Sequence, residues 1–240
     1  MSLVSALEAD EGVTCFVGAG GKKSTIYKLA TELPRAIVTN TVRIPLFDEH
    51  VDQVSLKTDP SSAIQDIDIR PLGLVAGKEG TDRYTGYQPE TIDKLAASTS
   101  DPILVKADGA RMRRFKAPGD NEPQLPSSTD TVVPIVSIHV IGQPLDDRLV
   151  HRVDRVSQLT GLSLGDTITP EAVATVITSR DGGRKAVPDE ATVIPLINMV
   201  DTPEYCAQAA EVAEEMHAKA QLDRVVLARM NTDSPVVSIC

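Results

Sequence analysis

Hydrophobic positions follow two different spacings along this chain, and the spacings predict which segments are strands and which are helices. Residues 13–17, 35–40 and 101–108 are short apolar runs of the length expected for buried strands. Residues 22–33 and 203–221 instead repeat apolar side chains every three or four positions, as amphipathic helices do. Strands that alternate with helices predict an α/β fold, with a mostly parallel sheet flanked by helices in three layers.

The rest of the chain predicts further elements of the same kind. We expect a strand at 235–239 to lie at the edge of the sheet, because Pro235 has no N–H to donate. We expect one domain over residues 1–240, with 142–190 as a candidate small insertion. The other predicted elements are helices at 3–9, 61–67, 89–98, 149–159 (carrying His151 and Arg152) and 169–177, strands at 53–56, 71–76, 131–140, 191–197 and 224–228, and loops at 77–86 and 179–189.

A glycine-rich turn joins the first predicted strand to the first long helix. A strand that turns through glycines into a helix leaves backbone N–H groups around one concavity, and such a concavity binds phosphate. We interpret this turn as a P-loop, in which a lysine adds positive charge and a hydroxyl holds Mg²⁺. The expected nucleotide-binding residues are Gly18, Ala19, Gly20, Gly21, Lys22, Lys23, Ser24 and Thr25.

The register of this P-loop has two solutions. The standard spacing G-x-x-x-x-G-K-[ST] would place Phe16 where the first glycine belongs. A contracted form, G-x-x-G-K, fits residues 18–22 and makes Lys22 the phosphate lysine and Ser24 the metal ligand. If the register slips by one residue, Lys23 is the phosphate lysine instead. A plain strand-to-helix turn of a parallel-sheet protein is the structural alternative.

A second informative stretch begins with the strand at 101–108. This strand delivers Asp108 at its carboxyl end, as P-loop proteins deliver a Walker-B carboxylate to Mg²⁺, so we expect Asp108 and Ser24 to hold the metal. A basic run follows, and it predicts a site for phosphates or for an acidic substrate; a solvated basic loop is the alternative. The residues expected to carry the chemistry are Asp108, Lys22, Arg111 and Lys116, with Arg114 as a further cation.

Two other predicted strands end in polar residues. The segment 39–41, Thr-Asn-Thr, follows the second strand, where ligands bind in open parallel sheets; it either contacts a substrate or closes a turn. Asn198 and Asp201 follow the strand at 191–197 in the pattern N-K-x-D, which grips guanine in GTP-binding proteins. Met199 replaces the lysine, and a simple turn is the alternative.

Composition excludes several classes of function. Among 240 residues, 34 are acidic and 24 are Lys or Arg, which gives a net charge of −10 and opposes nonspecific binding of nucleic acid. The chain has no tryptophan on which single-stranded bases would stack. It has no apolar run of about 18 residues and no signal-peptide pattern. We therefore expect a cytoplasmic protein that binds neither membrane nor nucleic acid, with an acidic surface suited to high salt.

Six sequence blocks resemble the YqeC family, whose members are named as selenium-dependent hydroxylase accessory or selenium cofactor biosynthesis proteins. The blocks recur in order over nearly the whole chain. The parts ADGAR, KAP and EP are the specific ones, since a P-loop is shared by many nucleotide-binding proteins. The blocks are GAGGKKST at 18–25, VTNTVRIP at 38–45, KADGARMRRFKAP at 106–118, NEP at 121–123, GQPLDD and VHR within 142–152, and INMVD at 197–201.

The resemblance implies a P-loop NTPase-like three-layer sandwich and a role in maturing molybdenum hydroxylases that carry a labile selenium. This chain departs from the family pattern at three positions: Lys23 stands where we expect Thr or Ser, Lys106 where we expect Glu, and Met199 where we expect Lys. The first removes a metal-binding hydroxyl, the second removes a carboxylate, and the third weakens specificity for guanine.

Two functions follow from these expectations. In the first, ATP or GTP binds with Mg²⁺ at residues 18–25, and the protein hydrolyses it or transfers a phosphoryl or nucleotidyl group during cofactor maturation. In the second, the same cradle holds a phosphate-bearing cofactor such as molybdopterin, and the protein carries that cofactor without turnover. A molybdenum hydroxylase, or its cofactor, is the expected partner in both.

Overall fold

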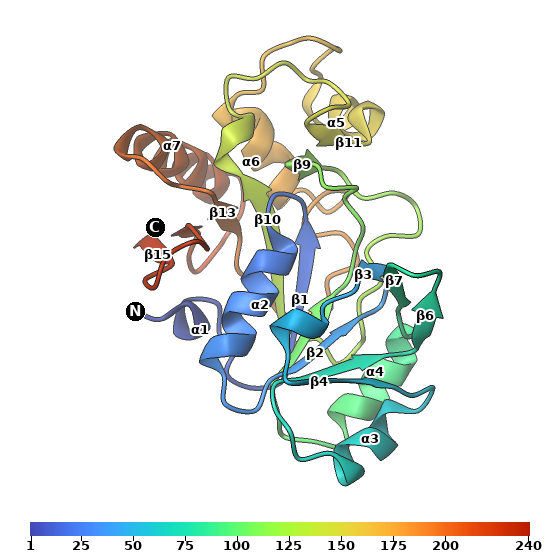
Figure 1. Ribbon diagram of the computed structural model, residues 1–240. Helices are drawn as coiled ribbons and strands as arrows, with labels where there is room; N and C mark the ends of the chain where they lie inside the picture. The colour runs from blue at the N-terminus through green and yellow to red at the C-terminus, as the bar shows by residue number, and fades with distance from the viewer.

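A ten-stranded sheet runs through the molecule, with β1 (Val13–Gly18) in the middle (Figure 1). The computed structural model describes residues 1–240, except for the side chain of Gln65. Strands from the first half of the chain lie on one side of β1 and strands from the second half on the other. The order along the sheet is β15 (Val236–Ile239), β14 (Val226–Ala228), β13 (Leu196–Asn198), β10 (Thr131–Ser137), β1, β8 (Ile103–Lys106), β2 (Ile37–Asn40), β5 (Leu72–Val75) and β4 (Gln53–Leu56), and the tenth strand, β12 (Thr192–Val193), pairs with β10 outside this order.

Neighbouring strands along this order are parallel, apart from the pair β14–β15. The register places Gly18 beside Ile135 of β10, and Phe16 beside Lys106 of β8. The carboxyl ends of the central strands therefore meet at one edge of the sheet. The chain first adds strands on one side of β1 and later adds strands on the other side. In open α/β sheets, ligands bind at the carboxyl ends of the strands where the strand order changes direction in this way.

Helices cover both faces of the sheet, as the alternation of side chains along its strands shows. Ile135 packs in the cluster with α1 (Leu3–Ala6) and α2 (Lys22–Glu32), whereas Val136 packs on the opposite face. That opposite face carries α3 (Pro60–Asp66), α4 (Pro89–Ala96), α6 (Pro170–Thr178) and α7 (Pro203–Lys219). The predicted α/β fold in three layers is confirmed.

Several predicted elements differ from those observed. Residues 77–86, predicted as a loop, contain β6 (Gly77–Glu79) and β7 (Arg83–Thr85); these two strands pair with each other, and β7 also pairs with β3 (Ile44–Pro45) in a small antiparallel sheet. The helix predicted at 149–159 begins only at Val153, because Arg152 has a left-handed φ of 63°. His151 is therefore not helical: it lies in β11 (Val150–His151), which pairs with β9 (Phe115–Lys116).

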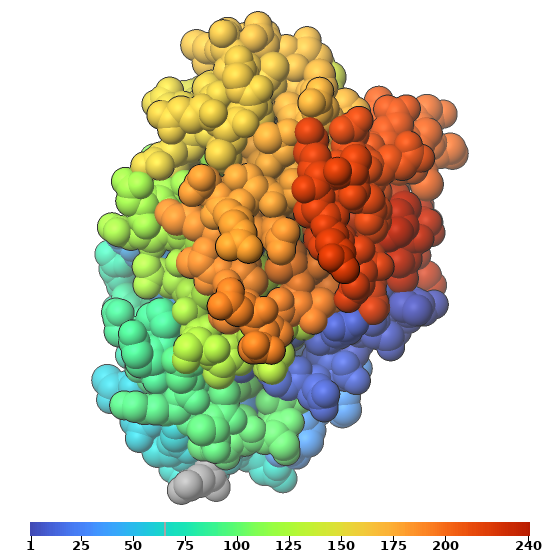
Figure 2. Space-filling view, turned by 180° about the vertical axis from the view of Figure 1, so that it is seen from behind, coloured from blue at the N-terminus to red at the C-terminus, as the bar shows by residue number. Residues whose placement is uncertain are grey.

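The second half of the chain completes the opposite face. Pro195 splits the strand predicted at 191–197 into β12 (Thr192–Val193) and β13. The strand predicted at 131–140 ends in a 3-10 turn, η2 (Ile138–Val140), and a second such turn, η1 (Asp48–His50), follows β3. Helix α5 (Val153–Thr160) and α6, both within 142–190, share an apolar cluster with α7. From behind, residues 179–191 (orange) run between the α5–α6 region and the α3–α4 region (Figure 2).

Candidate functional site

The glycine-rich loop at the carboxyl end of β1 has a backbone that only glycine adopts without strain. Gly18, Gly20 and Gly21 have φ values of +86°, +97° and +129°. A Cβ at Gly20 would meet the backbone nitrogen of Ser137 and would lie 2.8 Å from the carbonyl oxygen of Arg114. The loop is therefore pressed between the end of β10 and the segment that leads into β9.

This loop leaves a run of backbone donors free at the start of α2. The N–H of Gly18 donates to Asp108 Oδ2 at 2.9 Å, and the N–H of Ala19 donates to the Ile135 carbonyl at 2.8 Å. Within the described part of the chain, the N–H groups of residues 20–24 have no acceptor. Successive free N–H groups at a helix N-terminus favour an anion, so the loop has the donor arrangement predicted for phosphate.

Lys22 is the lysine that lies against this loop. Its Nζ donates to the Gly18 carbonyl oxygen and lies 2.8 Å from Asp108 Oδ1, and its side chain is buried. Lys23 is partly exposed and has no ion-pair or hydrogen-bond partner for its ammonium among the described residues. The geometry thus favours the register in which Lys22 is the phosphate lysine.

The two hydroxyl residues at the helix start differ in exposure. Ser24, the predicted metal ligand, is exposed to solvent. Thr25 is buried, and its Oγ1 donates to the Gly21 carbonyl at 3.1 Å. The hydroxyl of Thr25 therefore stabilises the loop itself.

Asp108 is the buried carboxylate that connects the loop to β9. Its Oδ2 lies 2.9 Å from Lys116 Nζ, so two ammonium groups flank one carboxylate that is 2% exposed. Burial raises the pKa of Asp108, but the ammonium groups of Lys22 and Lys116 outweigh this effect and lower that pKa below its usual range. Burial also lowers the pKa of Lys22, and Asp108 opposes this shift. Because the carboxylate is charged, the 2.8 Å contact between Lys22 Nζ and Asp108 Oδ1 is an ion pair.

Glu122 continues the series of charged side chains on the side away from the glycine-rich loop. It accepts from Lys116 Nζ at 2.7 Å and from Arg152 Nη1 at 2.6 Å, and burial of this carboxyl is outweighed by these cations, which lower its pKa. The alternating series of Lys22, Asp108, Lys116, Glu122 and Arg152 has an excess of positive charge, although the whole protein is acidic. Such local excess favours an anionic ligand.

Two more titratable groups border this cluster. Lys106 Nζ donates to the Arg43 carbonyl at 2.8 Å, and burial together with the charge of Lys22 lowers the pKa of Lys106 to about 7. Burial and the charge of Arg152 lower the pKa of His151 to about 4, so this imidazole is neutral at pH 7. The sequence analysis did not identify Lys106 as a site residue.

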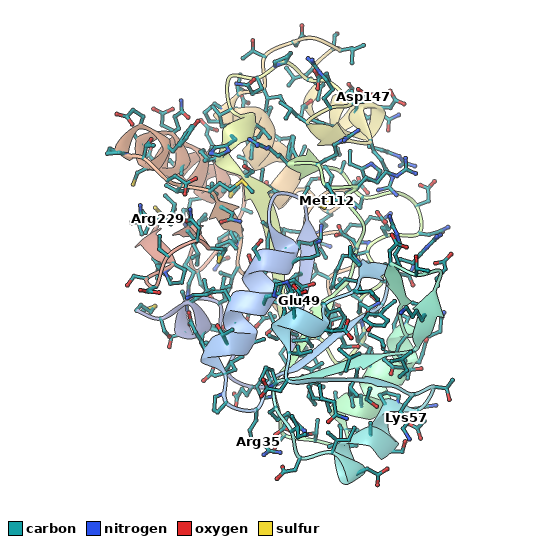
Figure 3. All side chains as sticks on the ribbon, in the orientation of Figure 1. Arg35, Glu49, Lys57, Met112, Asp147 and Arg229 are labelled. Carbon is teal, nitrogen blue, oxygen red and sulfur yellow. The ribbon has the colours of Figure 1, made fainter. Side chains whose placement is uncertain are left out.

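The basic loop after Asp108 has an exposed tip. Arg111 and Met112 have left-handed φ values of 46° and 61°, and Met112, labelled in Figure 3, is 81% exposed. Arg111 is exposed, and no described residue forms an ion pair or a side-chain hydrogen bond with it. Arg114 instead donates from Nη1 to His139 Nδ1 at 2.8 Å. Arg111 is thus not brought against Asp108, whereas Lys116 is.

The residues predicted to bind guanine lie in different surroundings. Asn198 is buried, and its Nδ2 donates to the Gly20 carbonyl at 2.9 Å, so it holds the glycine-rich loop. Asp201 is exposed, and its Oδ2 lies 3.8 Å from His139 Nε2. The His139 ring packs on Tyr205 with centroids 4.7 Å apart. Sequence analysis missed His139 and Tyr205, because no motif connects them before the chain folds.

The predicted metal pair does not by itself make a magnesium site. Both oxygens of Asp108 already face ammonium groups, and Ser24 is exposed. Throughout the part of the chain that the structure describes, no three His, Cys, Asp or Glu side chains are grouped so that they could hold a metal ion. Mg²⁺ at phosphate sites is usually bound by one or two carboxylates together with phosphate oxygens and waters. While Lys22 and Lys116 face both oxygens of Asp108, neither oxygen is free to bind such an ion.

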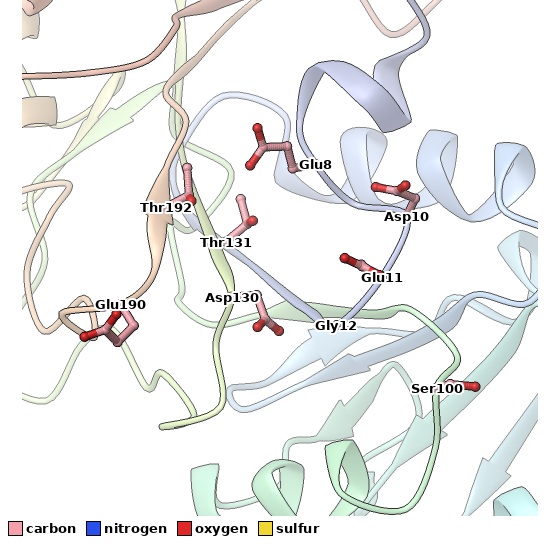
Figure 4. Close-up of a pocket in the computed structure, with 9 residues that line it drawn as sticks. All are labelled: Glu8, Asp10, Glu11, Gly12, Ser100, Asp130, Thr131, Glu190 and Thr192. Carbon is pink, nitrogen blue, oxygen red and sulfur yellow. The ribbon is translucent and has the colours of Figure 1, made fainter.

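A hollow of about 590 Å³ lies at the opposite edge of the sheet, around the amino ends of β1, β10 and β12 (Figure 4). Its lining has five carboxylates, whose charge disfavours a phosphate ligand. The phosphate-binding prediction therefore belongs to the other edge. The lining residues are Glu8, Asp10, Glu11, Gly12, Ser100, Asp130, Thr131, Glu190 and Thr192.

Known proteins are similar to this chain in the region that contains the site. A model of the YqeC protein family matches residues 14–154, which include the glycine-rich loop, Asp108, Lys116 and Glu122. The chain belongs to the YqeC family. A relative in Escherichia coli (strain K12), described as uncharacterized protein YqeC, is 28% identical over an alignment of 225 residues that covers 88% of this chain and 88% of the relative. Asn198 and Asp201 lie outside the segment that the family model matches.

No helix formed by the described residues is long and apolar enough to cross a membrane.

Proposed function

We propose that this YqeC protein binds a nucleoside triphosphate, ATP or GTP, with its phosphates against residues 18–25. The single observation that carries this proposal is the run of unpaired N–H groups at residues 20–24 next to the buried Lys22 ammonium. Backbone donors, a helix N-terminus and a lysine together supply the usual surroundings of a bound phosphate.

The charges around Asp108 support the chemistry of a phosphate site. An arriving phosphate competes with Asp108 for the Lys22 ammonium, and Lys116 remains beside the carboxylate at 2.9 Å to compensate its charge. Lys116 and the nearby basic loop with Arg111 and Arg114 provide positive charge for a transferred phosphoryl group or an anionic substrate. The reaction we propose is hydrolysis of the nucleotide, or phosphoryl or nucleotidyl transfer, in the maturation of a selenium-dependent molybdenum hydroxylase.

Asp201 supports guanine as the base. Its exposed carboxylate can accept from the N–H groups of a guanine, whereas Asn198 is already bonded to the loop. Met199 cannot replace the lysine of the guanine motif in charge, and its Sδ instead accepts from Ser137 Oγ at 3.0 Å. We therefore include both ATP and GTP in the proposal, and binding experiments distinguish them.

A second candidate function is a carrier of a phosphate-bearing cofactor such as molybdopterin. It is favoured by the surroundings of the metal pair: Asp108 is held by two lysines, and Ser24 is exposed. A carrier needs the phosphate cradle and needs no metal or turnover.

Titration with mant-ATP and mant-GTP tests the cradle. We expect Lys22→Gln to weaken binding at least about tenfold, because the lost ion–phosphate contact corresponds to about 1.4 kcal/mol or more. Lys28→Gln, near the far end of the same helix, is the matched control and retains affinity. Lys23→Gln tests the alternative register, and a loss there instead of at Lys22 would assign Lys23 as the phosphate lysine. Thermal melts show that each variant is folded.

The two functions differ in turnover and in dependence on metal. Phosphate release is measured with each nucleotide, with and without Mg²⁺ and with a cofactor-loaded molybdenum hydroxylase. Release that requires the cradle supports the enzyme. Tight binding of molybdopterin with no release under any of these conditions supports the carrier.

A further inference from the structure

Two polar side chains end neighbouring strands beside the glycine-rich loop and are not used by the phosphate cradle. Asn40 ends β2 and Lys106 ends β8, and they are paired in the parallel register. Paired residues project to the same face of a sheet. Val38 and Leu104, two positions earlier in each strand, pack in the cluster beneath α2. Asn40 and Lys106 therefore project to the face on which α2 begins.

The hydrogen bonds of these two side chains are incomplete. Asn40 Nδ2 donates to the Val42 carbonyl at 2.6 Å, which fixes the amide orientation. Asn40 Oδ1 is then left buried, with no donor from the described chain. Lys106 Nζ has one partner, the Arg43 carbonyl, although an ammonium has three N–H groups. Asn40 is fully buried and Lys106 is 6% exposed, so bulk water does not satisfy either group.

The two unpaired groups together specify the chemistry of what they hold. Asn40 Oδ1 only accepts, so its partner must carry a proton to donate. The Lys106 ammonium only donates, so its partner must carry a lone pair. An ionised phosphate or carboxylate satisfies Lys106 but leaves Asn40 unpaired. A hydroxyl group, which both donates and accepts, satisfies both.

We propose that Asn40 and Lys106 hold the attacking hydroxyl of the reaction, from water or from an alcohol acceptor, beside the phosphate cradle. This inference rests on the proposed nucleotide-binding function and assigns its second substrate. The hydroxyl donates to Asn40 Oδ1 and accepts from Lys106, which positions its oxygen at the start of α2, where the terminal phosphate is expected.

In the chemical step the Lys106 ammonium donates to the attacking oxygen and holds it in place. The hydroxyl oxygen forms a bond to the terminal phosphorus while the bond from that phosphorus to the bridging oxygen breaks, and the electron pair of that bond leaves with the nucleoside diphosphate. The hydroxyl proton, which is hydrogen-bonded to Asn40 Oδ1, passes to an oxygen of the transferred phosphoryl group.

The charged groups around Lys106 come from several elements. Lys22 at the start of α2 and Lys116 of β9 disfavour its charged form, whereas Asp108 and Glu122 favour it. A phosphate bound at Lys22 adds negative charge nearby and favours the ammonium form of Lys106, which is the form that donates to the hydroxyl.

A crystal structure with a non-hydrolysable ATP or GTP analogue tests the placement directly. We expect one oxygen, of water or of an alcohol, within hydrogen-bond distance of both Asn40 Oδ1 and Lys106 Nζ and facing the terminal phosphate. An analogue bound in the cradle with no such oxygen overturns this inference and leaves the proposed function intact. An analogue that does not bind in the cradle contradicts the proposed function first.

Kinetics of two variants provide the second test. Lys106→Met removes the donor that holds the attacking oxygen, and we expect it to reduce phosphate release at least about 100-fold, whereas Lys106→Arg keeps a donor and loses less. Affinity for mant-nucleotide changes less than about threefold in both variants, because Lys106 contacts the hydroxyl and not the nucleotide. Lys57→Met, at an exposed lysine, is the control. Equal losses of affinity and rate, or an unchanged rate, contradict the inference.

Discussion

Asp108 is the residue on which the charges of the site depend. Its carboxylate lies between Lys22 and Lys116, both almost fully buried, at 2.8 and 2.9 Å. Burial of an ammonium without a counter-ion is strongly unfavourable. The site is thus stable only while one carboxylate faces both lysines or while a bound anion takes its place.

Asp108→Asn is predicted to lower the free energy of unfolding by about 3–5 kcal/mol, because it leaves two buried cations with one fewer partner. Urea unfolding at pH 7 measures the change. Asp120→Asn, which removes a carboxylate that is 81% exposed, is the control and is expected to change stability by less than about 1 kcal/mol. Phosphate in the buffer should restore part of the stability lost in Asp108→Asn and have no such effect on the control.

Lys106→Met is predicted to be more stable than the wild type at pH 6, by about 1 kcal/mol or more, because it removes a buried charge. The pKa of Lys106 is lowered from 10.5 to about 7 in the folded protein, so between these values the unfolded chain binds more protons and wild-type stability rises with pH. The advantage of the variant should therefore shrink from pH 7 towards pH 10, by up to about 1.4 kcal/mol per unit. Urea unfolding at pH 6, 8 and 9.5 measures this; a constant difference contradicts it.

Single residues were predicted from sequence when their neighbours along the chain defined a motif. Gly18, Lys22 and Asp108 belong to such motifs, and the structure brings them together. Lys106 and Asn40 were not joined by the sequence analysis, because their relation is a pairing between strands 66 positions apart. Arg111 was predicted from its charge alone. The charge of an arginine in a loop does not determine whether its side chain points towards Asp108 or into solvent.

At the scale of elements, the loop between β1 and α2 is the least tolerant of change. Gly20→Ala is predicted to lower stability by about 2–4 kcal/mol, from a left-handed φ of +97° and from the backbone of Ser137 in the space of the added methyl. Gly142→Ala is the matched control: it has φ +77° and no atom within 4 Å of the added Cβ, so it should lose only about 1 kcal/mol. Thermal and urea unfolding measure the stability of both variants. Equal losses of stability in Gly20→Ala and Gly142→Ala would contradict the role assigned to the backbone of Ser137.

The longest elements were predicted well because their patterns are local. The periodic apolar positions of α2 and α7 and the apolar runs of β1 and β8 suffice to define them. The β6–β7 hairpin was missed, since short polar strands have no strong pattern and depend on pairing with β3. The start of α5 was predicted too early. The backbone at Arg152 is left-handed although this residue is not a glycine, so the sequence did not indicate a turn there.

At the scale of the whole molecule, charge is distributed unevenly. The net charge is −10, yet the edge that carries the glycine-rich loop has an excess of buried cations, and the opposite edge has the acidic hollow. A negatively charged ligand is therefore repelled by most of the surface and attracted at one edge.

Stability is predicted to increase when the salt concentration is raised from 0.1 to 2 M KCl, because screening weakens the repulsion among the surface carboxylates. Each kcal/mol gained raises Tm by about 2–4 °C for a protein of this size. Calorimetry at several KCl concentrations measures the shift. A variant with five exposed Asp or Glu residues changed to Asn or Gln should gain less from salt, and a lower Tm in high salt would contradict the prediction.

The hydrogen bond from Asn198 to the Gly20 carbonyl joins residues 178 positions apart. It has a consequence for the order of events during protein synthesis. A nascent chain on the ribosome contains the whole glycine-rich sequence long before Asn198 has been translated, and therefore without the contact that holds the loop in shape. Ligand capture becomes available only once the last quarter of the polypeptide emerges, so prematurely terminated products should not compete with the finished protein.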